Sequence, residues 1–90
     1  MRLISQNKIV DIDYDGAVVY INRDAGDKIY VFVHVPDEEF SLGAYYTFED
    51  AVFVMSLIRT TFMCNHRFFY MPDAEEVPVM RANRKEGEKK

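Results

Sequence analysis

Residues 44–71 carry the sequence AYYTFEDAVFVMSLIRTTFMCNHRFFYM, which predicts a strand, a capped helix and a second strand. Thr47 is the expected N-cap, because its side-chain oxygen can accept a hydrogen bond from a free backbone N–H of the first turn. Glu49 and Asp50 follow at the positive end of the helix dipole, and Asp50 completes a variant capping box. Asn65 tolerates the left-handed conformation that ends many helices, so the helix is expected to stop there.

The predicted helix carries apolar residues on two sides. One stripe has the spacing of three and four residues that is typical of the buried face of an amphipathic helix, and we expect this face to pack on the sheet. It consists of Ala51, Val54, Met55, Ile58 and Phe62. A second stripe on nearly the opposite side consists of Phe53, Leu57 and Cys64, with Val52 and Met63 alongside. Soluble monomers seldom leave such a patch bare. Two interpretations stay open: the chain itself covers the second stripe, or Phe53, Leu57 and Met63 contact a second copy or a protein partner.

The rest of the chain predicts strands in an α+β fold. Short runs of alternating or β-branched residues lie at 1–6, 9–14, 17–22, 29–35, 40–46 and 67–71, separated by turn residues. Both faces of 29–35 are apolar, which favours a central strand. We expect an antiparallel β-meander of five to six strands with one long helix packed on one face, in the order βββββαβ. Residues 1–73 form the single domain, and 74–90 are expected to be a disordered charged tail.

Composition bounds the class of protein. Ninety residues allow one domain at most, and 49% apolar with 14% aromatic residues suffice for a core. The chain has no apolar run near the roughly 18 residues of a membrane span, and residues 1–6 turn polar too early for a secretory signal. The single cysteine, Cys64, fits a reducing compartment. A cytoplasmic protein with no membrane contact is therefore expected.

Charge is distributed unevenly along the chain. Residues 1–78 hold 6 Lys/Arg against 13 Asp/Glu, a net charge of −7, whereas residues 79–90 hold 5 against 2, a net charge of +3. An acidic folded part argues against nucleic-acid binding through phosphate contacts. The basic residues of the tail are Arg81, Arg84, Lys85, Lys89 and Lys90. Weak nucleic-acid binding through this tail is one alternative function.

Constellations that would carry chemistry are incomplete. Residues 11–16 copy the first half of an EF-hand loop, but Asn22 stands where the bidentate Glu is needed, so the carboxylates are expected to line a solvated strand face. Cys64 and His66 are two apart at a helix end and do not face each other as a nucleophile and base would. With His34 they lack the Cys-x-x-Cys spacing of a zinc site. No catalytic, cofactor-binding or metal-ligating residue, cofactor or small-molecule substrate is predicted, and the chain is not expected to be an enzyme.

Five acidic residues offer another alternative. They are Asp37, Glu38, Glu39, Glu49 and Asp50. Their ordinary interpretation is a solvated surface. Their functional interpretation is a patch that imitates nucleic-acid phosphates and inhibits a host nucleic-acid enzyme or defence system.

Two segments resemble a known group of proteins. The start, MRLISQ followed by Val10-Asp-Ile-Asp-Tyr14, is similar to that of small proteins from phages and mobile elements of Gram-positive bacteria. The helix start and the end of the last strand match the same group at Tyr45 or Tyr46, Thr47, Glu49, Ala51, Met55, Ile58, Arg59, Met71 and Pro72. The resemblance implies a phage or prophage origin in a bacterial host cell and no agreed biochemical role.

The chain departs from that group on the second stripe of the helix. Val52, Phe53 and Leu57 stand where such helices usually carry charged or polar side chains. This departure favours association with another protein surface. The expected function is therefore that of a non-enzymatic phage-like protein acting through protein–protein contact, either with a protein partner or as a homodimer.

Overall fold

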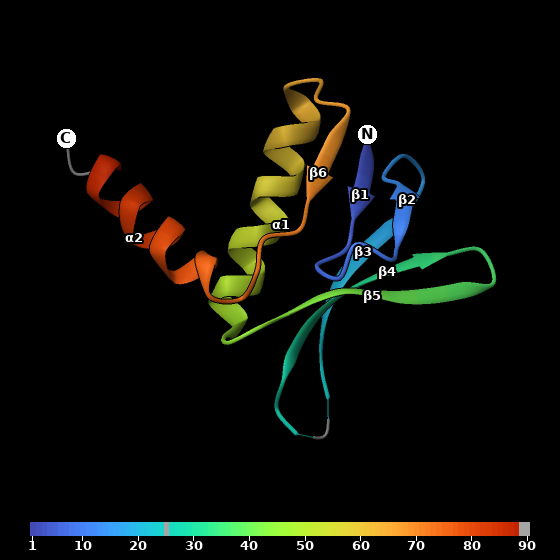
Figure 1. Cartoon of the computed structure of the whole chain (residues 1–90), viewed down its shortest axis with the longest axis horizontal. Helices are drawn as coiled ribbons and strands as arrows, with labels where there is room; N and C mark the ends of the chain where they lie inside the picture. Colours follow the sequence, from blue (N-terminus) through green and yellow to red (C-terminus); the bar gives the residue numbers. More distant parts are fainter. Residues whose placement is uncertain (25, 89–90) are drawn as a thin grey trace.

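The computed structural model describes residues 1–24 and 26–88, so residue 25 of the predicted hairpin loop and residues 89–90 of the predicted tail lie outside the described residues. It is an α+β fold in the order βββββαβα (Figure 1). The elements are β1 (Arg2–Ile4), β2 (Asp11–Asp13), β3 (Val18–Arg23), β4 (Ile29–Val35), β5 (Glu38–Tyr45), α1 (Phe48–Met63), β6 (Phe68–Tyr70) and α2 (Glu76–Glu88). Within the described ranges, neither helix has both the length and the apolar character needed to cross a bilayer.

The strands form two three-stranded sheets, in the orders β2-β1-β6 and β3-β4-β5. The prediction of a single meander was wrong. The β1–β2 hairpin does not continue into β3, because the turn at Gly16, whose φ is +80°, redirects the chain into the other sheet. Instead β6 returns beside β1 and pairs with it in parallel. A parallel pair needs a long crossover, and the chain from β2 to α1 provides it.

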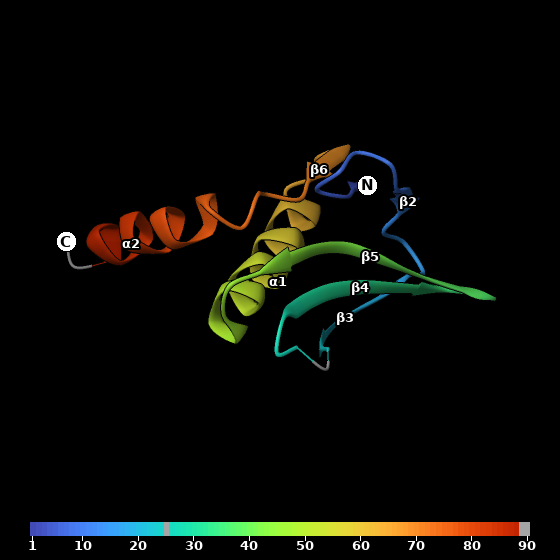
Figure 2. The ribbon, with the colours of Figure 1, turned by 60° about the horizontal axis from the view of Figure 1, so that its bottom comes forward.

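Helix α1 confirms Thr47 as the N-cap, Asn65 as the left-handed residue at its end, and most of the first apolar stripe, of which Phe62 is 39% exposed. The Thr47 side-chain oxygen accepts from the Asp50 backbone N–H at 3.0 Å, and Asn65 has the expected positive φ of 62°. The first-stripe residues Ala51, Val54 and Ile58 are buried against the sheets, Met55 is half-buried, and Phe62 meets Tyr14 edge to face with ring centroids 5.1 Å apart. Helix α1 contacts all three strands of the β3-β4-β5 sheet (Figure 2).

Strand β4 is central, as its two apolar faces predicted. Ile29, Val31 and Val33 are buried beneath α1. The opposite row carries an aromatic ladder, in which Phe32 stacks on Tyr20 with ring centroids 5.7 Å apart. Only one face of this sheet is therefore part of the core.

Gln6 joins the two sheets. Its side-chain Nε2 donates to the carbonyls of Ala44 (3.1 Å) and Pro72 (2.9 Å), and its Oε1 accepts from the Ala44 N–H (2.9 Å). Its backbone N–H donates to the Leu42 carbonyl at 2.8 Å. The Gln6 amide thus hydrogen-bonds the free edge of β5 as another strand would. Gly43 is required beside it, since a Cβ there would lie 2.6 Å from the Gln6 Cδ.

Helix α2 lies in residues that were predicted to have no fixed structure, so the single predicted helix is incomplete. Val77 is fully buried (0% exposed). The Arg81 Nη1 donates to the Asp50 Oδ1 at 2.7 Å, and Asp50 is only 2% exposed. The Asp50 carboxylate, which the sequence assigned to capping α1, is the ion-pair partner that holds α2 in place. The high content of charged residues in this segment predicted disorder, and nothing in the sequence indicated the ion pair between Arg81 and Asp50.

Tyr45 gives the fold a predicted alkaline sensitivity. Its hydroxyl donates to the Pro72 carbonyl at 2.8 Å, and burial raises the pKa of Tyr45 well above its ordinary value of 10. The folded state therefore holds the phenolic proton more tightly than the unfolded chain. The stability contributed by neutral Tyr45 is fully present below about pH 10 and is lost as the pH rises beyond it. In urea titrations, wild type is expected to lose more unfolding free energy between about pH 9 and pH 11 than Tyr45→Phe. Equal losses would contradict this account.

Candidate functional site

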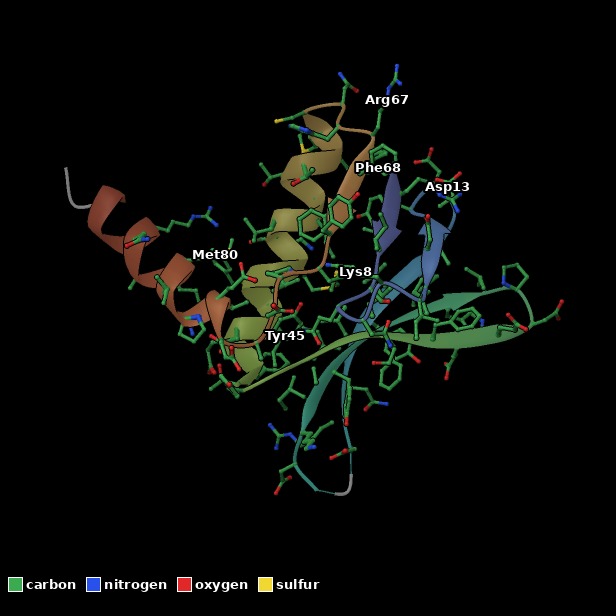
Figure 3. All side chains as sticks on the ribbon, viewed as in Figure 1. Lys8, Asp13, Tyr45, Arg67, Phe68 and Met80 are labelled. Atoms are coloured by element: carbon green, nitrogen blue, oxygen red, sulfur yellow. The ribbon has the colours of Figure 1, made fainter. Side chains whose placement is uncertain are left out.

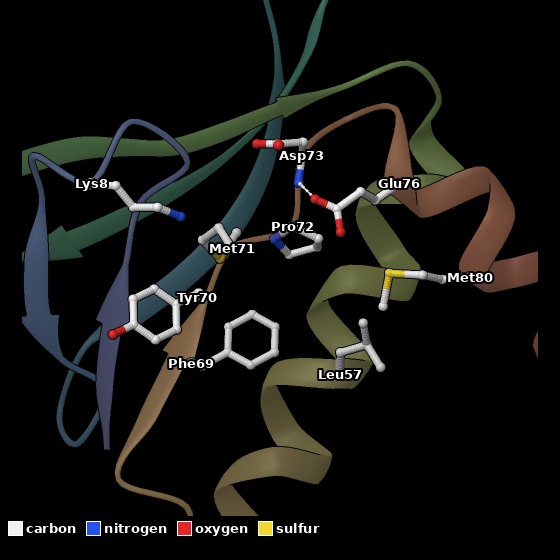
Figure 4. A pocket seen from close by; sticks show the side chains of 9 residues that line it. All are labelled: Lys8, Leu57, Phe69, Tyr70, Met71, Pro72, Asp73, Glu76 and Met80. Carbon is white, nitrogen blue, oxygen red and sulfur yellow. Dashed lines mark hydrogen bonds between the residues drawn. The ribbon is translucent and has the colours of Figure 1, made fainter.

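Leu57, one residue of the second apolar stripe of α1, lines an open groove. The groove has a volume of about 280 Å³ and lies between α1, β6 and the start of α2 (Figure 4). It is lined by Lys8, Leu57, Phe69, Tyr70, Met71, Pro72, Asp73, Glu76 and Met80.

Three elements each place an apolar side chain at the groove. Leu57 comes from α1, and Met80 comes from α2 one turn after the buried Val77, on the same face of that helix. Side chains alternate along β6, so Phe69 turns inward while Phe68 and Tyr70 are exposed. Figure 4 shows Leu57, Phe69 and Met80 around one space. The arrangement suits an apolar side chain from outside the protomer.

The two rims of the groove carry opposite charge. On the side of β1, the Lys8 Nζ lies 5.2 Å from the centre of the Tyr70 ring, a cation–π contact. On the side of α2 are Asp73 and Glu76, and the Glu76 Oε1 accepts from the Asp73 N–H at 3.3 Å. A ligand in the groove would thus meet a cation at one end and carboxylates at the other.

The residues predicted for partner contact do not form one bare patch. Phe53 is half-buried, with the Arg84 guanidinium carbon 5.5 Å from its ring centre. Leu57 is half-buried in the groove, whereas Met63 is 80% exposed at the end of α1 and outside the groove lining. Helix α2 and β6 thus partly cover the stripe and leave the groove beside Leu57.

Sequence reasoning missed most of the groove. Phe69 was part of a predicted strand, but its position depends on the parallel pairing of β6 with β1. Met80 and Val77 were placed in the tail, although their spacing of three is that of a helix face. Lys8 lies in a turn with φ +67° (Figure 3). It is distant in sequence from the other residues of the groove, so the sequence did not indicate it.

The five predicted acidic residues are split between two places. Asp37, Glu38 and Glu39 lie at the β4–β5 turn, while Glu49 and Asp50 lie at the start of α1. The eight-residue strand β5 separates them by roughly 25 Å at about 3.3 Å per residue. Asp50 is buried against Arg81, so its carboxylate is not part of the surface. The structure does not bring these residues into one patch.

Residues considered for metal or nucleophilic chemistry are also dispersed. In the part of the chain that the structure describes, His, Cys, Asp and Glu form no group of three arranged to hold a metal ion. Cys64 and His66 are both exposed. The Asp11 carboxylate accepts from the Arg2 Nε at 2.8 Å on the exposed face of β1 and β2, which is the solvated strand face that the sequence predicted.

Comparison with known proteins returns no relative. No protein-family model matches the chain, and neither a curated protein nor a solved structure matches it. The function therefore has to be inferred from the groove itself.

Proposed function

We propose that the chain is a non-enzymatic, phage- or prophage-related protein of the bacterial cytoplasm that acts through contact with a protein partner. The observation that carries the proposal is the groove formed by Leu57, Phe69 and Met80 with charge at both rims. The resemblance of the MRLISQ start and of the capped helix to phage and mobile-element proteins supports the origin. Leu57 stands where helices of that group usually carry a charged or polar side chain, and this apolar residue supports contact with a protein partner.

The groove suits one protruding apolar side chain of a partner. Burying a Leu or Phe there stabilises the contact by about 1.5–3 kcal/mol. Lys8 at one rim and Asp73 with Glu76 at the other then select a partner segment with an acidic and a basic group on either side. Phe68 is exposed and stacks on the groove residue Tyr70 with ring centroids 6.5 Å apart, which extends the apolar surface beside the groove.

A pull-down from bacterial host lysate tests the proposal. Wild type is compared with Leu57→Glu, which places a charge in the groove, and with Thr60→Glu, which adds the same charge at an exposed position of the same helix. We expect wild type and Thr60→Glu to capture the same partner. Leu57→Glu is expected to capture it at least tenfold less, because a carboxylate cannot be buried in the apolar contact without a large desolvation cost.

Circular dichroism of the three proteins serves as the folding control. A Leu57→Glu protein that folds like wild type and still captures the partner would contradict the groove as the contact surface. An unrelated acidic protein serves as the control bait. If wild type captures only the proteins that this control bait also captures, the proposed function is contradicted.

A further inference from the structure

Strand β6 is an edge strand of its sheet. It pairs with β1 on one side and, in the described part of the chain, with no strand on the other. The Arg67 carbonyl accepts from β1 at 2.7 Å, and the Met71 N–H donates to β1 at 2.9 Å. Backbone groups alternate in direction along a strand. In this register Phe68 and Tyr70 therefore turn their N–H and C=O groups away from β1, toward the free edge.

This free edge borders the groove. The groove is lined both by Phe69, on the half-buried face of β6, and by Tyr70, on its exposed face. Consecutive side chains of a strand lie on opposite faces, so a groove that both of them line runs along the edge of the strand. Figure 1 shows β1 on one side of β6 and α1 on the other. The unpaired backbone groups thus lie beside the apolar side chains of the groove.

An added strand would place a side chain in the groove. Strand β6 has only three residues, and a short edge by itself is a poor template for pairing. Here the groove supplies further contacts. The side chain directly opposite Phe69 would lie on the same face of the sheet as Phe69, in the space bordered by Leu57 and Met80. An extended segment therefore gains both backbone hydrogen bonds and apolar burial.

The charge of the groove indicates what stands two residues away in that segment. The next side chain on the same face would lie opposite Met71. Figure 4 shows Asp73 and Glu76 at the opposite end of the groove from Phe69. Both residues are exposed, and among the described residues neither has an ion-pair partner. A Lys or Arg at this position of the segment would meet both carboxylates.

We propose that the partner contributes an extended segment that pairs antiparallel with β6, with a Lys or Arg two residues before the apolar residue that enters the groove. Antiparallel pairing is the more stable arrangement, and it lets Phe68 and Tyr70 each exchange two hydrogen bonds with the residue opposite. The basic residue comes first because β6 runs toward Asp73. This inference rests on the proposed function and names the chemistry of its partner.

Binding of synthetic peptides to the full chain, measured by fluorescence anisotropy, tests the proposal. The probe is fluorescein-labelled Thr-Lys-Thr-Leu-Thr-Thr, in which Lys and Leu share one face of an extended chain. The control peptide, Thr-Thr-Lys-Leu-Thr-Thr, has the same composition but puts Lys and Leu on opposite faces. The probe is expected to bind at least tenfold more tightly than the control peptide. No binding of the probe, or equal binding of the two, would overturn the proposal.

Two methylated probes test the backbone pairing. N-methylation of the Thr between Lys and Leu removes the N–H that would donate to the Tyr70 carbonyl, and is expected to weaken binding at least tenfold. N-methylation of the Leu is the matched control, because in this pairing its N–H points away from β6. Equal effects of the two methyl groups, or a larger effect at the Leu, would contradict antiparallel pairing with β6.

A pair of protein variants tests the acidic end of the groove. Glu76→Gln removes the charge but keeps an oxygen that can accept from the Asp73 N–H, and is expected to weaken binding of the probe about threefold. Glu75→Gln is the matched control, since Glu75 is exposed beside it and does not line the groove. Equal binding by the two variants would contradict the role given to Glu76.

The outcome for these peptides is separable from that of the proposed function. If the peptides fail while wild type captures a partner from lysate and Leu57→Glu does not, only the extended segment is refuted. If wild type captures no specific partner, the proposed function itself is refuted.

Discussion

Gly43→Ala is expected to lower the free energy of unfolding by about 2–3 kcal/mol, because it displaces Gln6 and leaves the part-buried N–H and C=O of Ala44 without their Gln6 partner. The new methyl would lie 2.6 Å from the Gln6 Cδ and 2.9 Å from its Oε1. The Gln6 side chain is flexible, but three hydrogen bonds to Ala44 and Pro72 hold it in place. Moving it therefore breaks the contact that joins the two sheets. Urea unfolding followed by circular dichroism measures the loss.

A double-mutant cycle isolates this cause. Gln6→Ala alone is expected to cost a similar amount, and Gly43→Ala is expected to add little in that background, because the clash is gone. Ser41→Ala, at an exposed position of the same strand, serves as the control and is expected to be close to neutral. Additive losses from Gly43→Ala and Gln6→Ala would show that Gly43 acts through something other than Gln6.

Arg81→Leu is expected to destabilise the protein by about 2–3 kcal/mol, because it leaves the Asp50 carboxylate buried without its partner. Breaking a fully buried ion pair costs about 3–5 kcal/mol. The loss here is smaller because the Arg81 side chain is 32% exposed and Asp50 also faces the positive end of the α1 dipole. In a domain of this size, such a loss lowers the melting temperature by about 10 °C or more.

The partner residue provides the control for this prediction. Asp50→Asn combined with Arg81→Leu removes the uncompensated charge and is expected to recover part of the lost stability. Amide hydrogen exchange along α2 should accelerate in Arg81→Leu, because the ion pair docks α2 on α1. An Arg81→Leu protein with the melting temperature and α2 protection of wild type would contradict the role given to this ion pair.

Features that depend on neighbouring residues were predictable from the sequence. Thr47 and Asn65 mark the two ends of α1 through local backbone chemistry. The two apolar faces of residues 29–35 identified the central strand, and the spacing of Ala51, Val54 and Ile58 identified the buried side of α1. In each case the signal and its structural consequence lie within a few residues of each other.

Features that depend on distant contacts were not predictable. The parallel pairing of β1 with β6 joins residues more than sixty positions apart and splits the strands into two sheets. Helix α2 forms in a charged segment, where the buried Val77 and the Asp50–Arg81 pair hold it on the domain. The groove is formed only when β6 and α2 are both in place, because β6 supplies Phe69 and α2 supplies Met80. The sequence therefore indicated Leu57 but not Phe69 or Met80.

Methyl NMR of the labelled protein, titrated with the partner recovered from lysate, tests the central claim most directly. The groove predicts that the methyl signals of Leu57, Met71 and Met80 shift most, while that of Ala51, buried on the opposite side of α1, stays in place. The contrary result is a set of shifts confined to the exposed face of β3 and β4, with Leu57 and Met80 unchanged.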